Sequence, residues 1–265
     1  MTRFCTLFSG SSGNAVYLST EEGAILIDCG MSGRQTLESM CAAGLEPDAL
    51  RAILITHEHS DHVKGAGILS RKLHIPIYAT EGTWADMESA VGAVPAHHRI
   101  VIGAGESFFL DELEIVPFSI PHDAADPVGY RIYTPKTSVA VATDLGYFAD
   151  SVFDAISGAE IVLLESNHDP DMLGRNPHYP AHLKKRILGK KGHLSNETGA
   201  QAAVKLAAAG THHLLLGHLS SENNTPELAY RTVHTALCQA GAEVGGDVTL
   251  HVAGRYQVSH MYTMK

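Results

Sequence analysis

The sequence predicts an α/β fold in which helices cover β-sheets. Short apolar runs bounded by turn residues recur through the first two thirds of the chain, and longer segments with helix-capping signals follow from about residue 195. Strands and helices mixed in this order are typical of sheets packed against helices. The chain has 265 residues, of which 45% are hydrophobic and 18% charged, so it can bury a sizeable core. Its length alone allows one or two domains.

The first half of the chain is mostly strands. Two short strands flank the glycine-serine turn 9–14, and further strands are expected at 24–27, 52–56, 75–78, 100–102, 107–110, 113–118, 128–133, 138–143 and 161–164. Helices are expected around 35–43 and from Asp61 to about Leu73.

The last third is mostly helical. Ser195 or Asn196 can cap a helix that stops at Gly210. A strand is expected at 214–216, and Thr225-Pro226 begins a second helix that ends near Gly241.

Composition limits the cellular setting. No window approaches the roughly 18 consecutive apolar residues of a membrane span, and the first residues lack the basic patch and apolar run of a signal peptide. The four cysteines Cys5, Cys29, Cys41 and Cys238 form no C-x-x-C pair, which predicts neither a disulfide framework nor a thiolate zinc site. We therefore expect a cytoplasmic protein without membrane contact, and the sequence leaves its oligomeric state open.

Charge and histidine content point to a localised site. The formal net charge of −10 argues against broad, sequence-independent adhesion to nucleic acid. The chain also carries 17 histidines, and histidine is the commonest metal ligand in proteins. Together these features favour a metal site over an extended basic face.

The segment 56–62, Thr-His-Glu-His-Ser-Asp-His, is the strongest signal for metal binding. Alternate residues of an extended chain point to the same side, so His57 and His59 can bind one ion from a strand end. Asp61 and His62 fall where a helix begins and can face a second ion. A solvated polar loop would be the alternative, but it does not explain three imidazoles and a carboxylate within six residues.

Three further candidate ligands stand at the ends of apolar runs. His122 follows Ile120-Pro121, His218 follows the strand 214–216, and Asp144 ends the strand 138–143. A carboxylate that terminates a buried strand needs a partner to offset its desolvation. Each residue alone could be a satisfied core or capping residue, but with the segment 56–62 we expect all three to bind metal.

The pattern H-x-H-x-D-H, followed by His122, Asp144 and His218, resembles the signature of the metallo-β-lactamase superfamily. The resemblance covers nearly the whole chain. It implies an αββα sandwich, in which two mixed sheets lie face to face with helices on the outer faces, and a single domain over residues 1–265. It also implies that Asp28, after the strand 24–27, supports the metal-binding loop.

The resemblance further implies two metal ions. One would be held by His57, His59 and His122, and the other by Asp61, His62 and His218, with Asp144 bridging the two. Mixed imidazole and carboxylate ligands suit zinc, with manganese or iron as alternatives. A flavin-linked di-iron branch of the superfamily would have a glutamate in place of His59, and Glu58 is out of phase for that role, so we expect no redox function.

Other segments resemble the WalJ/YycJ-like branch of the superfamily, and they lie at 8–14, 165–169, 179–187, 192–197 and 217–224. Members of that branch are treated as DNA 5′→3′ exonucleases related to ribonucleases J and Z. The resemblance therefore implies a two-metal phosphodiesterase in which a metal-bridging hydroxide attacks phosphorus, with Asp61 orienting it. A thioester or lactone hydrolase of the same fold and a non-catalytic metal-bound regulator are the alternatives, and the residues do not separate DNA from RNA.

A basic stretch supports phosphate chemistry independently. Residues 182–196 contain five lysines and arginines and no acidic residue, and they lead into His193 at the start of a predicted helix, where backbone N–H groups favour an anion. A solvated helix face followed by a turn is the alternative. The five basic residues are Lys184, Lys185, Arg186, Lys190 and Lys191.

Several residues are expected to contact the substrate. His193 would touch the phosphate or protonate the leaving oxygen. The phosphate contacts are expected from Lys190, Lys191, Ser195 and Asn196, and from Ser11, Ser12 and Asn14, although a plain hairpin explains the last three equally well. His168 and Asp169 can line the pocket or serve the structure, and the pairs 97–98 and 212–213 are interpreted as surface or supporting histidines.

Overall fold

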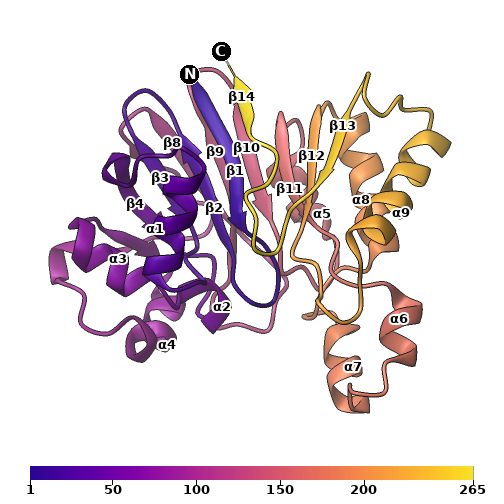
Figure 1. The fold of residues 1–265 in the computed structure, drawn as a ribbon, viewed down its shortest axis with the longest axis horizontal. Coiled ribbons are helices and arrows are strands. Elements are labelled where there is room, and N and C mark those ends of the chain that lie inside the picture. The colour runs from indigo at the N-terminus through magenta and orange to yellow at the C-terminus, as the bar shows by residue number, and fades with distance from the viewer. Residues whose placement is uncertain (265) are drawn as a thin grey trace.

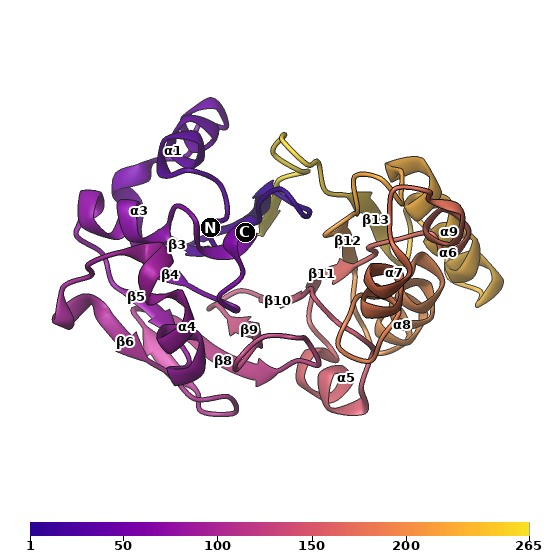
Figure 2. The same cartoon turned by 90° about the horizontal axis from the view of Figure 1, so that it is seen from below.

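Figures 1 and 2 show a computed structural model that describes residues 1–264 as two β-sheets lying face to face between two layers of helices. Each sheet has seven strands within the described residues and mixes parallel with antiparallel pairs. The expected α/β class and αββα sandwich are therefore confirmed. That the chain is a single domain stays a prediction.

The first sheet is built from the N-terminal third of the chain and one C-terminal strand. Its strands β1 to β3 pair antiparallel, β3 to β6 pair parallel, and β14 joins β1 antiparallel at the edge. In spatial order the strands are β14 (Tyr262–Met264), β1 (Thr2–Phe8), β2 (Ala15–Ser19), β3 (Ala24–Ile27), β4 (Leu50–Leu54), β5 (Ile77–Ala79) and β6 (Arg99–Val101).

The second sheet contains the strands from the middle of the chain. Its strands β10 to β13 pair parallel, and β7 to β10 pair antiparallel. In spatial order they are β13 (Thr249–Val252), β12 (His213–Gly217), β11 (Ile161–Glu165), β10 (Ser138–Ala142), β9 (Val128–Tyr133), β8 (Leu113–Ser119) and β7 (Phe108–Leu110).

Helices cover both outer faces. Those packed on the first sheet are α1 (Gly33–Ala42), α2 (Ser60–Val63), α3 (Ala66–Leu73) and α4 (Glu81–Val91). Those packed on the second sheet are α5 (Asp150–Ile156), α8 (Asn196–Ala208) and α9 (Pro226–Gln239). The short helices α6 (Pro170–Arg175) and α7 (Ala181–Ile187) project beyond the sheet edge, at the lower right of Figure 1.

Apolar side chains on the two faces of the strands form three layers, one between the sheets and one under each layer of helices. In β4, Ala52 and Leu54 face the core between the sheets, whereas Ile53 faces the layer under the helices. In β12, Leu215 faces the core between the sheets, and Leu214 and Leu216 face α8 and α9. Side chains alternate in this way because successive residues of a strand point to opposite faces. One strand therefore contributes both to the core between the sheets and to the layer under the helices.

Most of the expected elements are present, with shifts of one to three residues at their ends. The helix expected from Asp61 to Leu73 is instead two helices, α2 and α3. They separate at Gly65, whose N–H donates to the Cys29 carbonyl at 2.8 Å rather than continuing the helix.

Several elements were not expected from the sequence. They are α4 to α7, β13 and β14. For α4 the signals are present, since the Thr80 side chain caps its first turn and Gly92, with a φ of 68°, ends it. The three-residue strand β14 is defined by its pairing with β1, which local sequence does not reveal. Within the described residues, no helix combines the length and apolar character that crossing a membrane requires.

Candidate metal centre

The first candidate metal position is formed by three imidazoles. His57 and His59 come directly after β4, and His122 follows β8. His59 Nδ1 lies 3.0 Å from His57 Nε2 and 3.3 Å from His122 Nε2. Three nitrogens converge here, and a neutral imidazole carries a proton on only one of its two nitrogens. Such crowding is favourable only with a proton or a cation between them, and these residues form one of the candidate ligand groups of the structure.

A second group lies beside the first and combines Asp61, His62 and His218. Asp61 Oδ2 is 3.7 Å from His62 Nε2 and 3.8 Å from His218 Nε2. Two ligand atoms that each lie about 2.0–2.2 Å from one zinc ion are at most about 4.4 Å apart. The observed separations therefore allow one ion to reach all three side chains.

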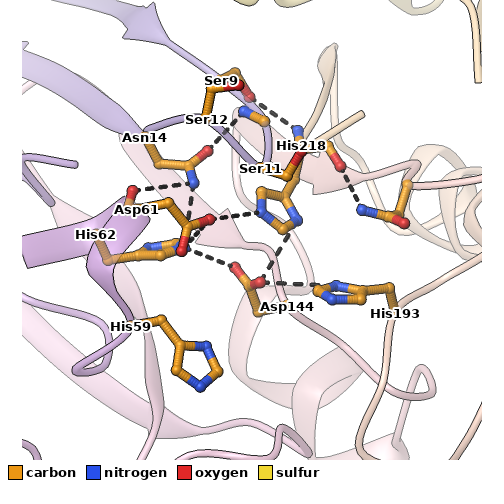
Figure 3. A network of polar contacts seen from close by, with 12 residues as sticks. Ser9, Ser11, Ser12, Asn14, His59, Asp61, His62, Asp144, His193 and His218 are labelled. Carbon is orange, nitrogen blue, oxygen red and sulfur yellow. Dashed lines mark hydrogen bonds and ion pairs between the residues drawn. The ribbon is translucent and has the colours of Figure 1, made fainter. Parts of the chain in front are cut away.

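Asp144 lies between the two groups. Its Oδ1 is 3.8 Å from His122 Nε2 in the first group, and its Oδ2 is 3.6 Å from His62 Nε2 in the second. Its Oδ1 also lies 3.4 Å from His218 Nδ1, so the carboxylate is within 4 Å of members of both groups, as a bridging ligand would be. Figure 3 shows Asp144 in contact with His62, His218 and His193.

Two buried polar atoms of the centre have no hydrogen-bond partner within the described residues. They are Asp144 Oδ2 and His218 Nε2, and both side chains are almost completely buried. Leaving a buried acceptor unsatisfied is costly, and such atoms in a native protein need an explanation. Bound divalent cations would supply it, so the residues present fit a metal centre.

The electrostatics of the protein also favour cations here. Burial opposes the protonated form of His62, yet Asp28, Asp144 and Asp61 raise its pKa to about 9. Burial likewise opposes the charged form of His218, but Asp144, Asp61 and Glu165 raise the pKa of this ring well above its usual value. The raised pKa values favour protonation of these two rings without metal, and metal binding would displace such protons.

Asp28 holds the metal-binding segment from behind. Its Oδ1 accepts from the Thr56 N–H at 2.8 Å, and its Oδ2 lies 2.8 Å from His62 Nδ1. Because an ionised carboxylate only accepts, His62 Nδ1 carries a proton and Nε2 is left to face the second metal position. The geometry is the one that a supporting role for Asp28 requires.

The backbone is strained at three of these positions. Asp28, Asp144 and His218 have φ values of 63°, 60° and 56°, in the left-handed region that residues other than glycine rarely adopt. All three lie just beyond the ends of strands, where the turn directs their side chains toward the centre. Strain of this kind persists where the surroundings enforce it, and it concentrates at functional sites.

Glu165, at the end of β11, is a site residue that the sequence analysis did not assign. It is fully buried, and its Oε1 lies 2.8 Å from His193 Nδ1 and 2.9 Å from His218 Nδ1. Its Oε2 accepts from the N–H groups of Leu145 and Leu194. Burial opposes ionisation of this carboxyl, but the two histidines and the hydrogen bonds hold its pKa below the usual range.

The ionised carboxylate of Glu165 therefore fixes the tautomer of both histidines. Each ring donates its Nδ1–H to Oε1 and leaves Nε2 free for the centre. The available signal was the one that identified Asp144, namely a carboxylate that ends a buried apolar strand.

The turn 9–14 packs against the metal-binding segment. Asn14 Oδ1 accepts from the Gly10 N–H at 2.8 Å, and Asn14 Nδ2 lies 3.1 Å from His62 Nε2 (Figure 3). Gly30 permits this close approach, because a Cβ there would lie 1.6 Å from the Asp61 carbonyl oxygen. Asn14 is thus a buried neighbour of a candidate ligand and does not line the open cavity.

An open cavity of about 230 Å³ leads to the centre. Its walls come from the candidate ligands, from the loops that follow the strands and from α7. They are Ser11, His59, Asp61, His122, Asp144, Asn167, Tyr179, Leu183, Arg186, Ile187, His193, His218 and Ser220.

The residues expected to contact phosphate are only partly brought together. Ser11 lines the cavity, whereas Ser12 is exposed outside its lining, with its Oγ 3.4 Å from Arg255 Nη1. Lys190 and Lys191 are exposed in the turn before His193.

The structure places Ser195 and Asn196 outside the cavity lining. Ser195 Oγ caps α8 by accepting from the Thr198 N–H. Asn196 is buried, and its amide group is bonded to Ser166 and Asn224. The polar groups of both side chains are thus bonded within the protein and are not directed at the cavity.

Several other polar residues lie outside the cavity lining. Asp169 caps α6 through the Met172 N–H, and His168 is buried, with its pKa lowered to about 4 by desolvation. His212 and Glu160 pair at the surface, at the N-terminal end of β12, away from the candidate ligands. His97 is exposed.

Comparison with known protein families gives one match that covers most of the chain. Residues 24–219 match the family described as "Beta-lactamase superfamily domain". Within this segment lie Asp28, the segment 56–62, His122, Asp144, Glu165, His193 and His218.

Two similar bacterial proteins match along nearly their full lengths. Exodeoxyribonuclease YycJ of Bacillus anthracis is 40% identical over 248 residues, which cover 94% of this chain and 94% of that protein. Exodeoxyribonuclease WalJ of Streptococcus pneumoniae serotype 2 is 39% identical over 251 residues, which cover 94% of this chain and 93% of that protein.

Solved structures share the fold at low sequence identity. The metallo-beta-lactamase fold protein YhfI from Bacillus subtilis superposes with a TM-score of 0.75 at 16% identity, covering 99% of this chain and 100% of that one. Zn(2+)-bound PqqB from Methylobacterium extorquens gives a TM-score of 0.74 at 18% identity, covering 98% and 99% of the two chains.

Proposed function

The chain belongs to the beta-lactamase superfamily domain family, and from this premise we propose that it is a two-metal phosphodiesterase, a 5′→3′ exonuclease that acts on DNA. The observation that carries the proposal is the pair of ligand groups joined by Asp144, with His193 beside them on Glu165. The full-length similarity to two exodeoxyribonucleases supports the polynucleotide substrate.

We propose the ligand assignment that the sequence resemblance implies, which two of the four candidate ligand groups support. His57, His59 and His122 hold one divalent ion, Asp61, His62 and His218 hold the other, and Asp144 contacts both. Zinc suits this donor set, with manganese or iron as alternatives. When bound, the ions supply Lewis acidity and neutralise negative charge on the phosphate.

The protein side chains supply position and protons. Asp61 is partly exposed to the cavity, so its carboxylate can orient the attacking water as well as bind metal. His193 also lines the cavity, 3.7 Å from Asp144 Oδ1 through its Nδ1. When its ring is doubly protonated, Nε2 donates a proton to the leaving oxygen, and the Glu165 carboxylate stabilises the positive ring.

Lys190 and Lys191 are proposed to bind phosphates of the strand outside the cavity. Both are exposed, and neither forms an ion pair within the described residues. The carbonyl of Lys191 accepts from the Asp123 N–H at 3.1 Å, which anchors this turn next to His122. Their charge therefore lies near the mouth of the cavity in a protein whose net charge is −10.

Reversal of both charges, Lys190→Glu with Lys191→Glu, should weaken cleavage of long DNA roughly tenfold. The number of counterions released on DNA binding, measured from the slope of log K against log salt, should fall by about one to two. Hydrolysis of bis(p-nitrophenyl) phosphate should change little. The matched control reverses two exposed lysines outside the cavity, Lys72 and Lys136, for the same change in net charge. An equal loss on both substrates would contradict a role in binding the strand.

The substrate class is tested by comparing cleavage of DNA with hydrolysis of thioesters and lactones by the metal-loaded protein. It should release nucleotides from 5′-phosphorylated DNA, and EDTA should stop the reaction. Turnover of thioesters or lactones alone would overturn the nuclease proposal and leave the fold and the metal centre standing. A metal-bound protein that hydrolyses neither would indicate a regulator.

We also propose a cytoplasmic location. The four cysteines are unpaired, as expected in a reducing compartment.

A further inference from the structure

The cavity above the metal centre has an apolar wall that phosphate hydrolysis does not require. Tyr179, Leu183 and Ile187 all line it and are only half-buried. Leu183 and Ile187 are four residues apart on α7, so their side chains lie on the same face of the helix. Metal ligands and phosphate contacts are polar, so this wall must face a different part of the substrate.

An ion pair and a backbone hydrogen bond join the wall to the residues of the centre. Arg186, on the same helix, forms an ion pair with Asp123, the residue next to His122. The His193 N–H donates to the Ile187 carbonyl at 3.0 Å. Gly192 allows the turn 187–193 to close, because a Cβ there would lie 2.1 Å from the Ile187 carbonyl oxygen. The apolar wall and His193 are therefore joined by contacts within one folded segment.

The size of the cavity limits what can enter. At about 230 Å³ it is smaller than the roughly 300–1,000 Å³ of pockets that take a drug-sized ligand. A single nucleotide is the largest unit of a DNA strand that such a space suits. The space suits one nucleotide better than a base pair, which favours an unpaired nucleotide, as in enzymes that draw a base out of its stack.

We propose that Tyr179, with Leu183 and Ile187, forms a nucleobase-stacking subsite that takes the unpaired terminal nucleotide of the strand. The inference rests on the proposed phosphodiesterase function and adds the part of the substrate that the wall contacts. Stacking on an aromatic ring accepts every base, because each base has a π-face. The subsite thus positions the terminal nucleotide without selecting sequence, and a blunt duplex has to fray at its end before cleavage.

The first test compares two 5′-phosphorylated single strands, one with a normal terminal nucleotide and one with an abasic terminal residue. For the wild type, kcat/KM should be roughly tenfold lower on the abasic strand. Tyr179→Ala should lose about the same factor on the normal strand and almost nothing on the abasic one, so the two rates become equal. Tyr179→Phe should keep the preference, and Tyr230→Ala, an exposed tyrosine on α9, should behave as wild type.

Misfolding of Tyr179→Ala would lower both rates together, whereas loss of stacking lowers only one. An unchanged preference in Tyr179→Ala, or a wild type that does not distinguish the two strands, would overturn the subsite.

The second test measures binding without catalysis. The metal-loaded protein should bind deoxyadenosine 5′-monophosphate roughly tenfold more tightly than 2-deoxyribose 5-phosphate, and Tyr179→Ala should remove the difference. If the wild type cleaves no polynucleotide, the proposed function is wrong, and this titration still decides the subsite. Equal affinity of the wild type for both compounds contradicts it.

Discussion

Asp144→Ala is expected to lose metal and turnover together. Asp144 is the one candidate ligand whose two oxygens face both groups, at 3.6 Å from His62 and 3.8 Å from His122. Without it neither ion keeps its full set of ligands, and the positive charge opposite the phosphate is lost. An ion contributes several kcal/mol of charge stabilisation, so kcat should fall by about 10³-fold or more. Elemental analysis and single-turnover assays measure the two losses.

The control for Asp144→Ala is Asp86→Ala, which removes an exposed aspartate on α4. It should keep wild-type metal content and rate. Thermal melting establishes that the Asp144 variant is folded. A folded Asp144→Ala protein with two ions and the wild-type rate would show that this residue does not bridge the centre.

His193→Ala is expected to keep its metals and still lose roughly 10²–10⁴ in kcat, the usual contribution of a general acid or base. His193 lies on the cavity and is fixed through Nδ1 by Glu165, whereas His218 Nε2 is buried and directed at the second ligand group. His218→Ala should therefore lose one ion. If His193→Ala sheds a metal and His218→Ala keeps both, the two roles are reversed.

Glu165→Gln separates these roles further. A glutamine cannot accept from two Nδ1–H groups and two backbone N–H groups in the same way, so both histidines lose their fixed tautomer. Loss of such a supporting carboxylate typically costs 10–100-fold in metal affinity or activity. The variant should weaken metal binding through His218 and lower kcat through His193. An unchanged metal affinity with a reduced rate would limit its role to His193.

The sequence was most informative where the chemistry is local. The segment 56–62 places four candidate ligands at fixed spacing, and His122, Asp144 and His218 were found because each follows an apolar strand. Parallel strands end at one edge of a sheet, so polar residues at those ends meet in space. The expected strands correspond closely to β3, β4 and β8 to β12, because each is an apolar run bounded by turn residues.

The sequence was least informative where a group's partner lies far along the chain. Glu165 contacts His193 and His218, which are 28 and 53 residues away along the chain. The sequence around Glu165 does not reveal either contact. The sequence predicted that Asn196 binds phosphate, but its side-chain amide donates a hydrogen bond to Asn224 from another loop. Arg186 was counted with the free basic residues, and it pairs with Asp123. Each of these contacts is set by the packing of distant segments.

The metal content of the wild-type protein tests the central claim most directly. Protein purified without chelator should contain about two transition-metal ions per chain by elemental analysis, and their removal should abolish phosphodiesterase activity. A metal-free wild-type protein that remains fully active would contradict the whole account.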